Sequence, residues 1–314
     1  MPAAMLPRAV PNVSWRAGVG LVADVIGLQN LGSIRGLLGV AGLLDSVIPA
    51  AALAAFLVSS LIVVRSVARR LEQRCQCRKA RKARFGRKGL VVSTASLLFV
   101  ASCLYRSVFV ADEGASLCRG APSVFNAPAS GRLVATIGEI ALVVQVTSYI
   151  DDTSRRLRVK RGLWAGYACF TYAPVVAAEC LSWCGVLTGV SKFFCCEYAM
   201  WMLLAVTWAW DSAELLHKST RLGDVLAHAS LLVAGVGLFL FNACHEMPHF
   251  LLLAPEEAAS GPGSALRCEQ DAQSPIWEKR LLFFLAYFFG CSWCSVAVSL
   301  RYLLRGGCKA GKAA

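Results

Sequence analysis

The sequence predicts an all-α integral membrane protein with about seven transmembrane helices, preceded by an N-terminal interfacial segment. Three observations carry this prediction. Hydrophobic residues make up 57% of the 314 residues and charged residues only 16%, fewer than a soluble domain of this size uses. The apolar residues gather in runs of spanning length without the alternation typical of membrane β-barrels. Short basic segments separate several of these runs.

The chain divides into three parts. Residues 1–42 form an N-terminal tail and interfacial segment, residues 43–304 a seven-helix transmembrane domain, and residues 305–314 a basic C-terminal tail. Residues 17–41 are rich in glycine and only mildly apolar, which is typical of a segment that lies in the membrane interface. The tail lacks a compact apolar core followed by small residues, so we expect no cleaved signal peptide.

The apolar runs place the individual spans. Three of them contain a proline. Pro49 is tolerated near the start of the first span, and we expect a kink at Pro174 in the fourth span and a break near Pro248 in the sixth. The sixth run is too long for one untilted crossing. The seven expected spans are residues 43–64, 90–111, 132–150, 162–190, 195–216, 222–253 and 281–304.

The polybasic loop 65–88, between the first two spans, sets the expected orientation. It holds eleven Lys and Arg residues and one acid, Glu72. Basic loops remain on the cytoplasmic side. With seven spans, that side then carries 22 Lys and Arg residues and the opposite side 8. We therefore expect an integral protein of the plasma membrane or an endomembrane, with the N-terminus outside or lumenal and the C-terminus cytoplasmic.

The net charge of +13 has a membrane explanation. The polybasic loop 65–88 is suited to anionic lipid of the cytoplasmic leaflet, and no interleaving of basic and aromatic residues indicates nucleic acid. The lipid bilayer and anionic lipid are thus the expected partners. Among the 14 cysteines, Cys118 and Cys268 lie squarely in loops on the opposite, oxidising side, and we expect them to form a disulfide.

Ionisable residues of different spans fall in the outer half of the membrane. With the direction of each span fixed, this set includes Arg106, Arg132, Glu139, Glu179 and Glu197. Charged groups at one depth on different helices can pair in the bundle interior, because an unpaired charge in hydrocarbon is costly. The pattern predicts a polar, outward-facing cavity that binds a ligand, or interhelical ion pairs that only hold the bundle together.

His245 and His249 form the sharpest local pattern. Histidines at positions i and i+4 share a helix face and can bind one metal ion, zinc above all, with a third ligand from one of the buried glutamates. Pro248 lies between them, and its ring opposes the carbonyl of Cys244, so the helix is not expected to be regular there. Pro248 weakens the case for a metal site, but the i, i+4 spacing keeps the pair a candidate zinc site.

Four stretches together resemble a family of polytopic membrane proteins of protists, algae and plants. This family has no assigned activity. They are Cys103–Phe109 (CLYRSVF), Gly131–Glu139 (GRLVATIGE), Glu179–Thr188 (ECLSWCGVLT) and Glu197–Trp201 (EYAMW). The resemblance implies a membrane fold over residues 90–254 and singles out the same five charged residues. The chain departs from this family by having Tyr198 in place of a second acid and by its paired histidines.

These observations lead to three functional hypotheses. The first is a receptor-like or transport-related protein that binds a small polar or charged ligand of unknown identity in the outer half. The second is a metal-dependent hydrolase, because His245 and His249 resemble the histidine pair of seven-span hydrolases of the alkaline ceramidase type; the third histidine of that family is not in its usual place. The third is a structural subunit without a site. The sequence leaves open whether the protein is an enzyme.

Overall fold

The computed structural model describes residues 42–76, 83–112, 117–159, 167–253, 268–271 and 276–307. Backbone contacts divide the chain into two units, Met1–Val40 and Ala41–Ala314. Apart from Gly42, the expected N-terminal segment lies outside the described residues, as do residues 308–314 of the expected C-terminal tail. The description below concerns the second unit.

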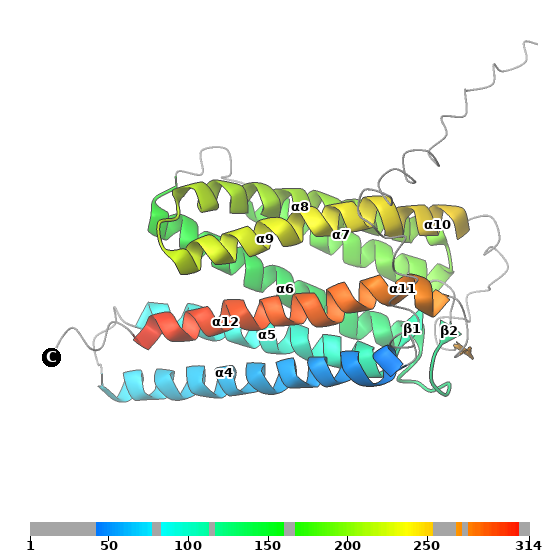
Figure 1. Ribbon diagram of the computed structural model, residues 1–314, viewed down its shortest axis with the longest axis horizontal. Coiled ribbons are helices and arrows are strands. Elements are labelled where there is room, and N and C mark those ends of the chain that lie inside the picture. The colour runs from blue at the N-terminus through cyan, green and yellow to red at the C-terminus, as the bar shows by residue number, and fades with distance from the viewer. Residues whose placement is uncertain are drawn as a thin grey trace, which may run out of the picture. The chain divides into compact units, whose positions relative to one another are not determined.

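Nearly all described residues of this unit are helical (Figure 1). In chain order the helices, with η marking π-helical segments, are η2 (Leu43–Val47), α4 (Ile48–Gln76), α5 (Ala83–Val108), α6 (Pro128–Leu157), α7 (Tyr167–Thr188), α8 (Ser191–Lys218), α9 (Leu222–Phe241), η3 (Asn242–Glu246), α10 (Met247–Leu253), α11 (Ile276–Phe284), η6 (Leu285–Cys291) and α12 (Ser292–Gly307).

Within the described residues, six helical stretches are long and apolar enough to cross a membrane. They are Leu43–Ala68, Lys88–Val108, Pro128–Leu157, Ser191–Lys218, Leu222–Glu246 and Arg280–Tyr302. This finding confirms the prediction of a multi-pass α-helical membrane protein. The remaining long helix, α7, lies within the range of the expected fourth span, and the count of seven spans stays a prediction.

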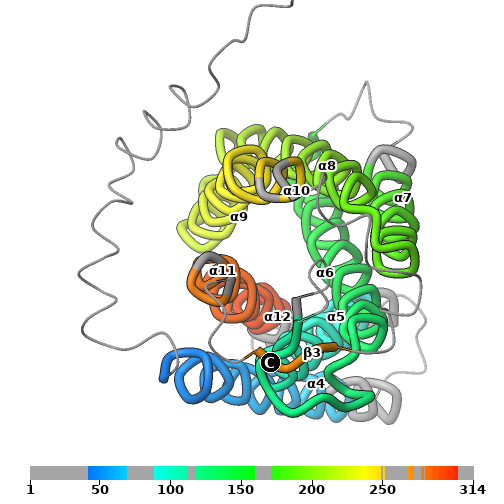
Figure 2. The backbone as a smooth tube through the Cα atoms, turned by 90° about the vertical axis from the view of Figure 1, so that its right-hand side faces the viewer, coloured from blue at the N-terminus to red at the C-terminus, as the bar shows by residue number. Residues whose placement is uncertain are grey.

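The helices form two groups with α6 between them (Figures 1 and 2). The α4–α5–α12 group also contains α11 and η6, and the α7–α8–α9 group also contains η3 and α10. Helix α6 packs on α5 from the first group and on α7 and α8 from the second. Helix α9 packs closely on α8 but makes few backbone contacts with α12, so side chains must join the groups along that edge.

The surface of the bundle is apolar and its interior contains polar side chains, the reverse of a soluble protein. Leu61, Val64 and Val233 are about two-thirds or more exposed, as expected for side chains that face lipid. Ser96 is fully buried and its hydroxyl lies 2.9 Å from that of Ser295, linking α5 to α12. The Ser295 hydroxyl donates to Gln145 of α6 at 2.6 Å, so buried hydrogen bonds connect three helices in mid-bundle.

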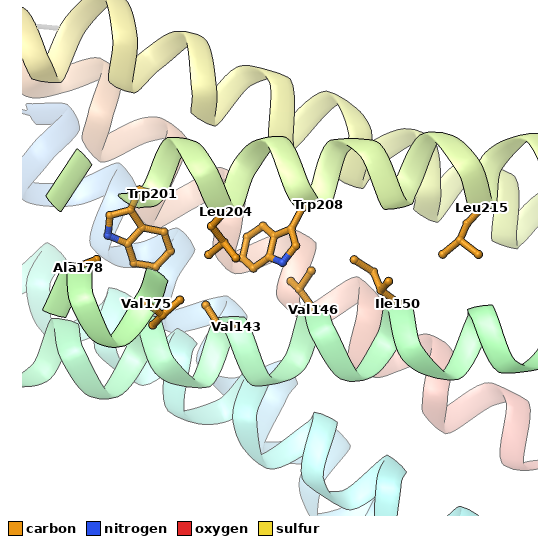
Figure 3. Close-up of a cluster of buried hydrophobic side chains, with 9 residues drawn as sticks. All are labelled: Val143, Val146, Ile150, Val175, Ala178, Trp201, Leu204, Trp208 and Leu215. Atoms are coloured by element: carbon orange, nitrogen blue, oxygen red, sulfur yellow. The ribbon is translucent and has the colours of Figure 1, made fainter. Parts of the chain in front are cut away.

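Apolar packing joins α6 to α7 and α8 (Figure 3). Trp201 and Trp208 extend from α8 toward the valines of α6, and both indoles are more than nine-tenths buried. The cluster consists of Val143, Val146, Ile150, Val175, Ala178, Trp201, Leu204, Trp208 and Leu215. On the other side of α6, a Cβ added to Gly138 would lie 2.5 Å from the Ser102 side chain, so α5 and α6 approach closely there.

Local sequence explains the ends of α6. Pro128 occupies the first position of the helix, where its missing N–H leaves no hydrogen bond unmade. At the other end Arg158 adopts a left-handed conformation (φ 54°), and the next residue, Val159, donates its N–H to the carbonyl of Ser154. The helix therefore begins four residues earlier and ends seven residues later than the expected third span.

The polybasic segment 65–88 is more helical than a loop prediction implies. Helix α4 continues to Gln76 and α5 begins at Ala83, and residues 77–82 lie outside the described part of the chain. Arginine and lysine are good helix formers, which allows both helices to extend beyond their apolar runs. We call the end of the bundle where α4 ends and α5 begins the basic end.

The opposite end of the bundle carries a small sheet, and we call it the sheet end (Figure 1). Strand β2 (Leu117–Cys118) pairs antiparallel with β1 (Ala111–Asp112) and parallel with β3 (Glu269–Gln270). Cys118 and Cys268 form a disulfide with a Cα–Cα distance of 5.6 Å. The expected disulfide is therefore confirmed, and it joins the loop after α5 to the segment before α11.

Removing this disulfide is expected to lower stability measurably. Cys118→Ser should reduce the free energy of unfolding by about 2–5 kcal/mol, because a crosslink across a long loop restricts the unfolded chain. Cys180→Ser, at an exposed free cysteine of α7, is the matched control and should change little. Urea unfolding in detergent measures both, and maleimide labelling of Cys118 and Cys268 in non-reduced protein would contradict the pairing.

Candidate functional site: a charged network inside the bundle

The network is centred on Arg132, in the second turn of α6. Its side chain is almost fully buried, and Nη2 lies 2.7 Å from Oε2 of Glu139 and 2.9 Å from Oε2 of Glu179. Its Nη1 lies 3.2 Å from Oε1 of Glu197. One guanidinium thus contacts carboxylates from α6, α7 and α8, which suits its fixed fan of N–H donors.

Side chains around Glu179 fix its carboxylate. The Thr136 hydroxyl, one turn after Arg132, donates to Glu179 Oε2 at 2.5 Å. The indole N–H of Trp183, one turn after Glu179, donates to the Thr136 oxygen at 3.2 Å. Since Thr136 and Trp183 come from α6 and α7, this chain of hydrogen bonds sets the register of the two helices at the level of Arg132.

Arg106 joins the network from the α4–α5–α12 group. Its Nη1 lies 3.5 Å from Oε1 of Glu139, and its guanidinium lies over the rings of Tyr287 and Phe288, at 5.5 and 5.6 Å from their centroids. The Tyr287 hydroxyl donates to the same Glu139 oxygen at 3.2 Å. Glu139 therefore links Arg132 on α6 to Arg106 and Tyr287 of the α4–α5–α12 group.

The structure thus brings together all five charged residues that the sequence placed at one depth: Arg106, Arg132, Glu139, Glu179 and Glu197. One detail of the prediction is wrong. Arg132 was expected to begin the third span, but α6 begins at Pro128, so Arg132 lies in its second turn and is 3% exposed. The extra turn places the guanidinium inside the bundle.

An open groove lined by described residues lies elsewhere. It has a volume of about 330 Å³, lies between α8 and α9, and is lined only by apolar atoms, among them Trp210, Gly235 and Phe239. Trp210 is 66% exposed, which places this groove on the apolar outer surface of the bundle. The groove is suited to lipid chains and does not coincide with the charged residues.

A second ion pair lies beside the network. Arg280 of α11 binds Glu246 of η3 through Nη2 and Oε2 at 3.1 Å, and both side chains are buried. Tyr198 of α8 lies close to the same carboxylate. This pair connects the α7–α8–α9 group to the α4–α5–α12 group near the sheet end, where backbone contacts are few.

π-Helical segments carry several of these residues. Glu246 belongs to η3, and Tyr287 and Phe288 belong to η6. The irregularity expected around Pro248 is confirmed by η3, although the helix continues to Leu253 instead of breaking. A π-helical turn rotates the side chains that follow it, and such turns are frequent at functional sites.

The histidine pair is placed only in part. Nδ1 of His245 lies 3.1 Å from Oε1 of Glu246, and its ring stacks on Phe241 at 5.0 Å. The side chain of His249 lies outside what the structure describes. Among the described residues, no group of three His, Cys, Asp or Glu side chains could hold a metal ion. Glu246 is instead bound to Arg280.

A third charged cluster lies near the basic end. Asp224, at the start of α9, is 2% exposed and accepts two hydrogen bonds of 2.9 Å from Arg156 of α6. Arg301 of α12 contacts the same carboxylate. Asp224 therefore joins α6, α9 and α12 at the end of the bundle opposite to Glu246.

The sequence analysis missed the partners Arg280, Asp224 and Arg301. A spacing signal exists. Asp224 and Glu246 are 22 residues apart, and Arg280 and Arg301 are 21 apart. On two antiparallel helices these nearly equal separations, about 32–33 Å, place each acid opposite a base.

Comparison with protein-family models, curated proteins and solved structures finds no match for this chain. The class of protein is therefore assigned from the fold and the charged network alone. The chain is a multi-pass α-helical membrane protein with charged residues paired inside its bundle.

Proposed function

We propose that the protein is a transport-related or receptor-like membrane protein, and that its charged network is the binding site for a small polar or charged ligand. Arg106 and Arg132 supply positive charge, and Glu139, Glu179 and Glu197 balance it. With seven spans and the basic end in the cytoplasm, this site lies in the outer half of the membrane. The disulfide Cys118–Cys268 supports that orientation, because it lies at the sheet end, which then faces an oxidising compartment.

The single observation that carries the proposal is that one buried arginine contacts three buried carboxylates from three helices. Charged residues at the centre of a bilayer are costly, by about 2.5–3.5 kcal/mol each on insertion scales. Replacing buried ion pairs by apolar residues is often neutral or stabilises by about 1–4 kcal/mol. Stability alone therefore does not explain why the network is present, which supports a binding role.

The remaining partners follow from the same orientation. The basic end would face the cytoplasmic leaflet, where the arginines and lysines of residues 65–88 bind anionic lipid headgroups. The apolar outer surface contacts the bilayer of the plasma membrane or of an endomembrane. We propose no nucleic-acid partner.

A ligand screen tests the proposal. Purified protein in nanodiscs is heated with sodium, ammonium, guanidinium, acetate, phosphate or glycine, and a bound species should raise the melting temperature. Glu139→Gln should abolish that shift while the yield of folded protein is retained. Glu214→Gln, at an exposed pair with Lys218, is the control and should keep the shift. If no species binds and Glu139→Gln only lowers the yield, the network is structural and the third hypothesis, a structural subunit, replaces this one.

A metal-dependent hydrolase is the alternative from another class. His245 would bind zinc together with His249, and Glu246 would have to exchange its contact with Arg280 for a role at the metal. Metal analysis of the purified protein separates the two hypotheses. Stoichiometric zinc that is lost in both His245→Ala and His249→Ala would favour the hydrolase, and zinc-free folded protein that still binds a ligand would remove it.

A further inference from the structure

The carboxyl groups of Glu139 and Glu179 lie unusually close together. Their Oε2 atoms bind the same nitrogen of Arg132, at 2.7 and 2.9 Å, so the two carboxyl groups lie side by side. A carboxylate only accepts hydrogen bonds, so two carboxyl groups can share one only if one of them carries a proton. Both side chains are more than nine-tenths buried.

The formal charges of the network also indicate that one carboxyl group carries a proton. Among the described residues it contains three carboxylates and two guanidiniums, and thus one negative charge in excess. A proton on the Glu139–Glu179 pair would make it neutral, which a low-dielectric interior favours.

Among the described residues, the titratable groups around the pair and around its charged neighbours come from several elements. They are Cys103 and Arg106 on α5, Arg132 on α6, Glu197 and Tyr198 on α8, His245 and Glu246 on η3, Arg280 on α11, and Tyr287 and Cys291 on η6. Glu246 and Arg280 balance each other's charge. The tyrosine hydroxyls and cysteine thiols are neutral in their ordinary form.

We propose that Glu139 and Glu179 form a proton-binding site that takes up one exchangeable proton. Binding converts one carboxylate of the pair to a carboxylic acid and brings the formal charge of the network from −1 to 0, and release returns the proton to water. This inference rests on the proposed function. A transport-related or receptor-like site would couple the binding of its ligand to the uptake or release of this proton.

Infrared difference spectroscopy of the full-length protein in nanodiscs tests the site without any ligand. At neutral pH the spectrum should contain the C=O band of one buried carboxylic acid, identified by its shift in D2O. Glu179→Gln and Glu197→Gln should each remove the band, because two carboxylates then balance two guanidiniums. Arg106→Gln should increase it, since a second proton is needed. Glu214→Gln, whose carboxylate lies outside the network, should leave it unchanged.

The outcomes separate this inference from the proposed function. A folded protein without a carboxylic acid band, or a band that survives both Glu179→Gln and Glu197→Gln, would overturn the proton site even if a ligand binds. A band that responds as expected establishes the site even if the ligand screen fails. Circular dichroism confirms that each variant is folded, and the isosteric Glu→Gln changes keep the packing.

Discussion

Arg132→Gln is expected to cause the largest loss of stability of any single substitution in the network. The change leaves Glu139, Glu179 and Glu197 facing one another without the guanidinium that contacts all three. Removing one partner of a buried ion pair typically destabilises a protein by about 3–5 kcal/mol, because the other charge stays buried. The midpoint of SDS-induced unfolding and the yield of monodisperse protein should both fall.

Two comparisons make that prediction specific. Arg155→Gln, on the same helix, removes an arginine whose side chain is 73% exposed and which pairs with Asp151 one turn away, so stability should change little. Adding Glu179→Gln to Arg132→Gln should recover part of the lost stability, since it removes one of the unpaired charges. Equal unfolding midpoints for Arg132→Gln and Arg155→Gln would show that the network does not hold the bundle together.

The class of fold was predictable because the length of an apolar run shows directly whether it can cross a membrane. Six such runs reappear as helices whose ends lie within seven residues of their expected positions. The ends of the helices were less predictable. The basic residues after Val64 read as loop by hydropathy, yet Arg65 to Gln76 continue α4, because hydropathy measures membrane preference and not helix propensity.

The five charged residues of the network could be found from sequence because depth follows from span direction. The ion pair between Arg280 and Glu246 was not predicted. Pairing Arg280 with Glu246 requires knowing that α11 lies beside η3, and residue 280 falls in the segment that hydropathy assigns to a loop. The π-helical segments η3 and η6 were not predictable in position either, since they depend on how neighbouring helices pack.

Glu246 and Asp224 have related roles at the two ends of the bundle. Helix α9 and its continuation η3 carry one acid near each end, and the antiparallel helix α11–η6–α12 carries one arginine near each end. Between these points the two helices have few backbone contacts. The ion pairs therefore hold this edge of the bundle closed, and removing one should loosen one end while the other remains paired.

Asp224→Asn is expected to have the second-largest effect. It leaves the guanidiniums of Arg156 and Arg301 next to each other without the carboxylate that both contact. Repulsion between the two arginines adds to the loss of both pairs, so we expect a destabilisation of about 3 kcal/mol or more, measured by the midpoint of SDS-induced unfolding.

A double-mutant cycle tests whether the loss arises from these contacts. Arg301→Gln added to Asp224→Asn should recover stability relative to Asp224→Asn alone, because the remaining Arg156 side chain is 30% exposed and can reach water at the basic end. Glu214→Gln, which breaks an exposed pair on α8, should not change the midpoint. Strictly additive effects of the two substitutions would mean that Asp224 and Arg301 are not coupled, and that the basic end of this edge is held closed by apolar packing instead.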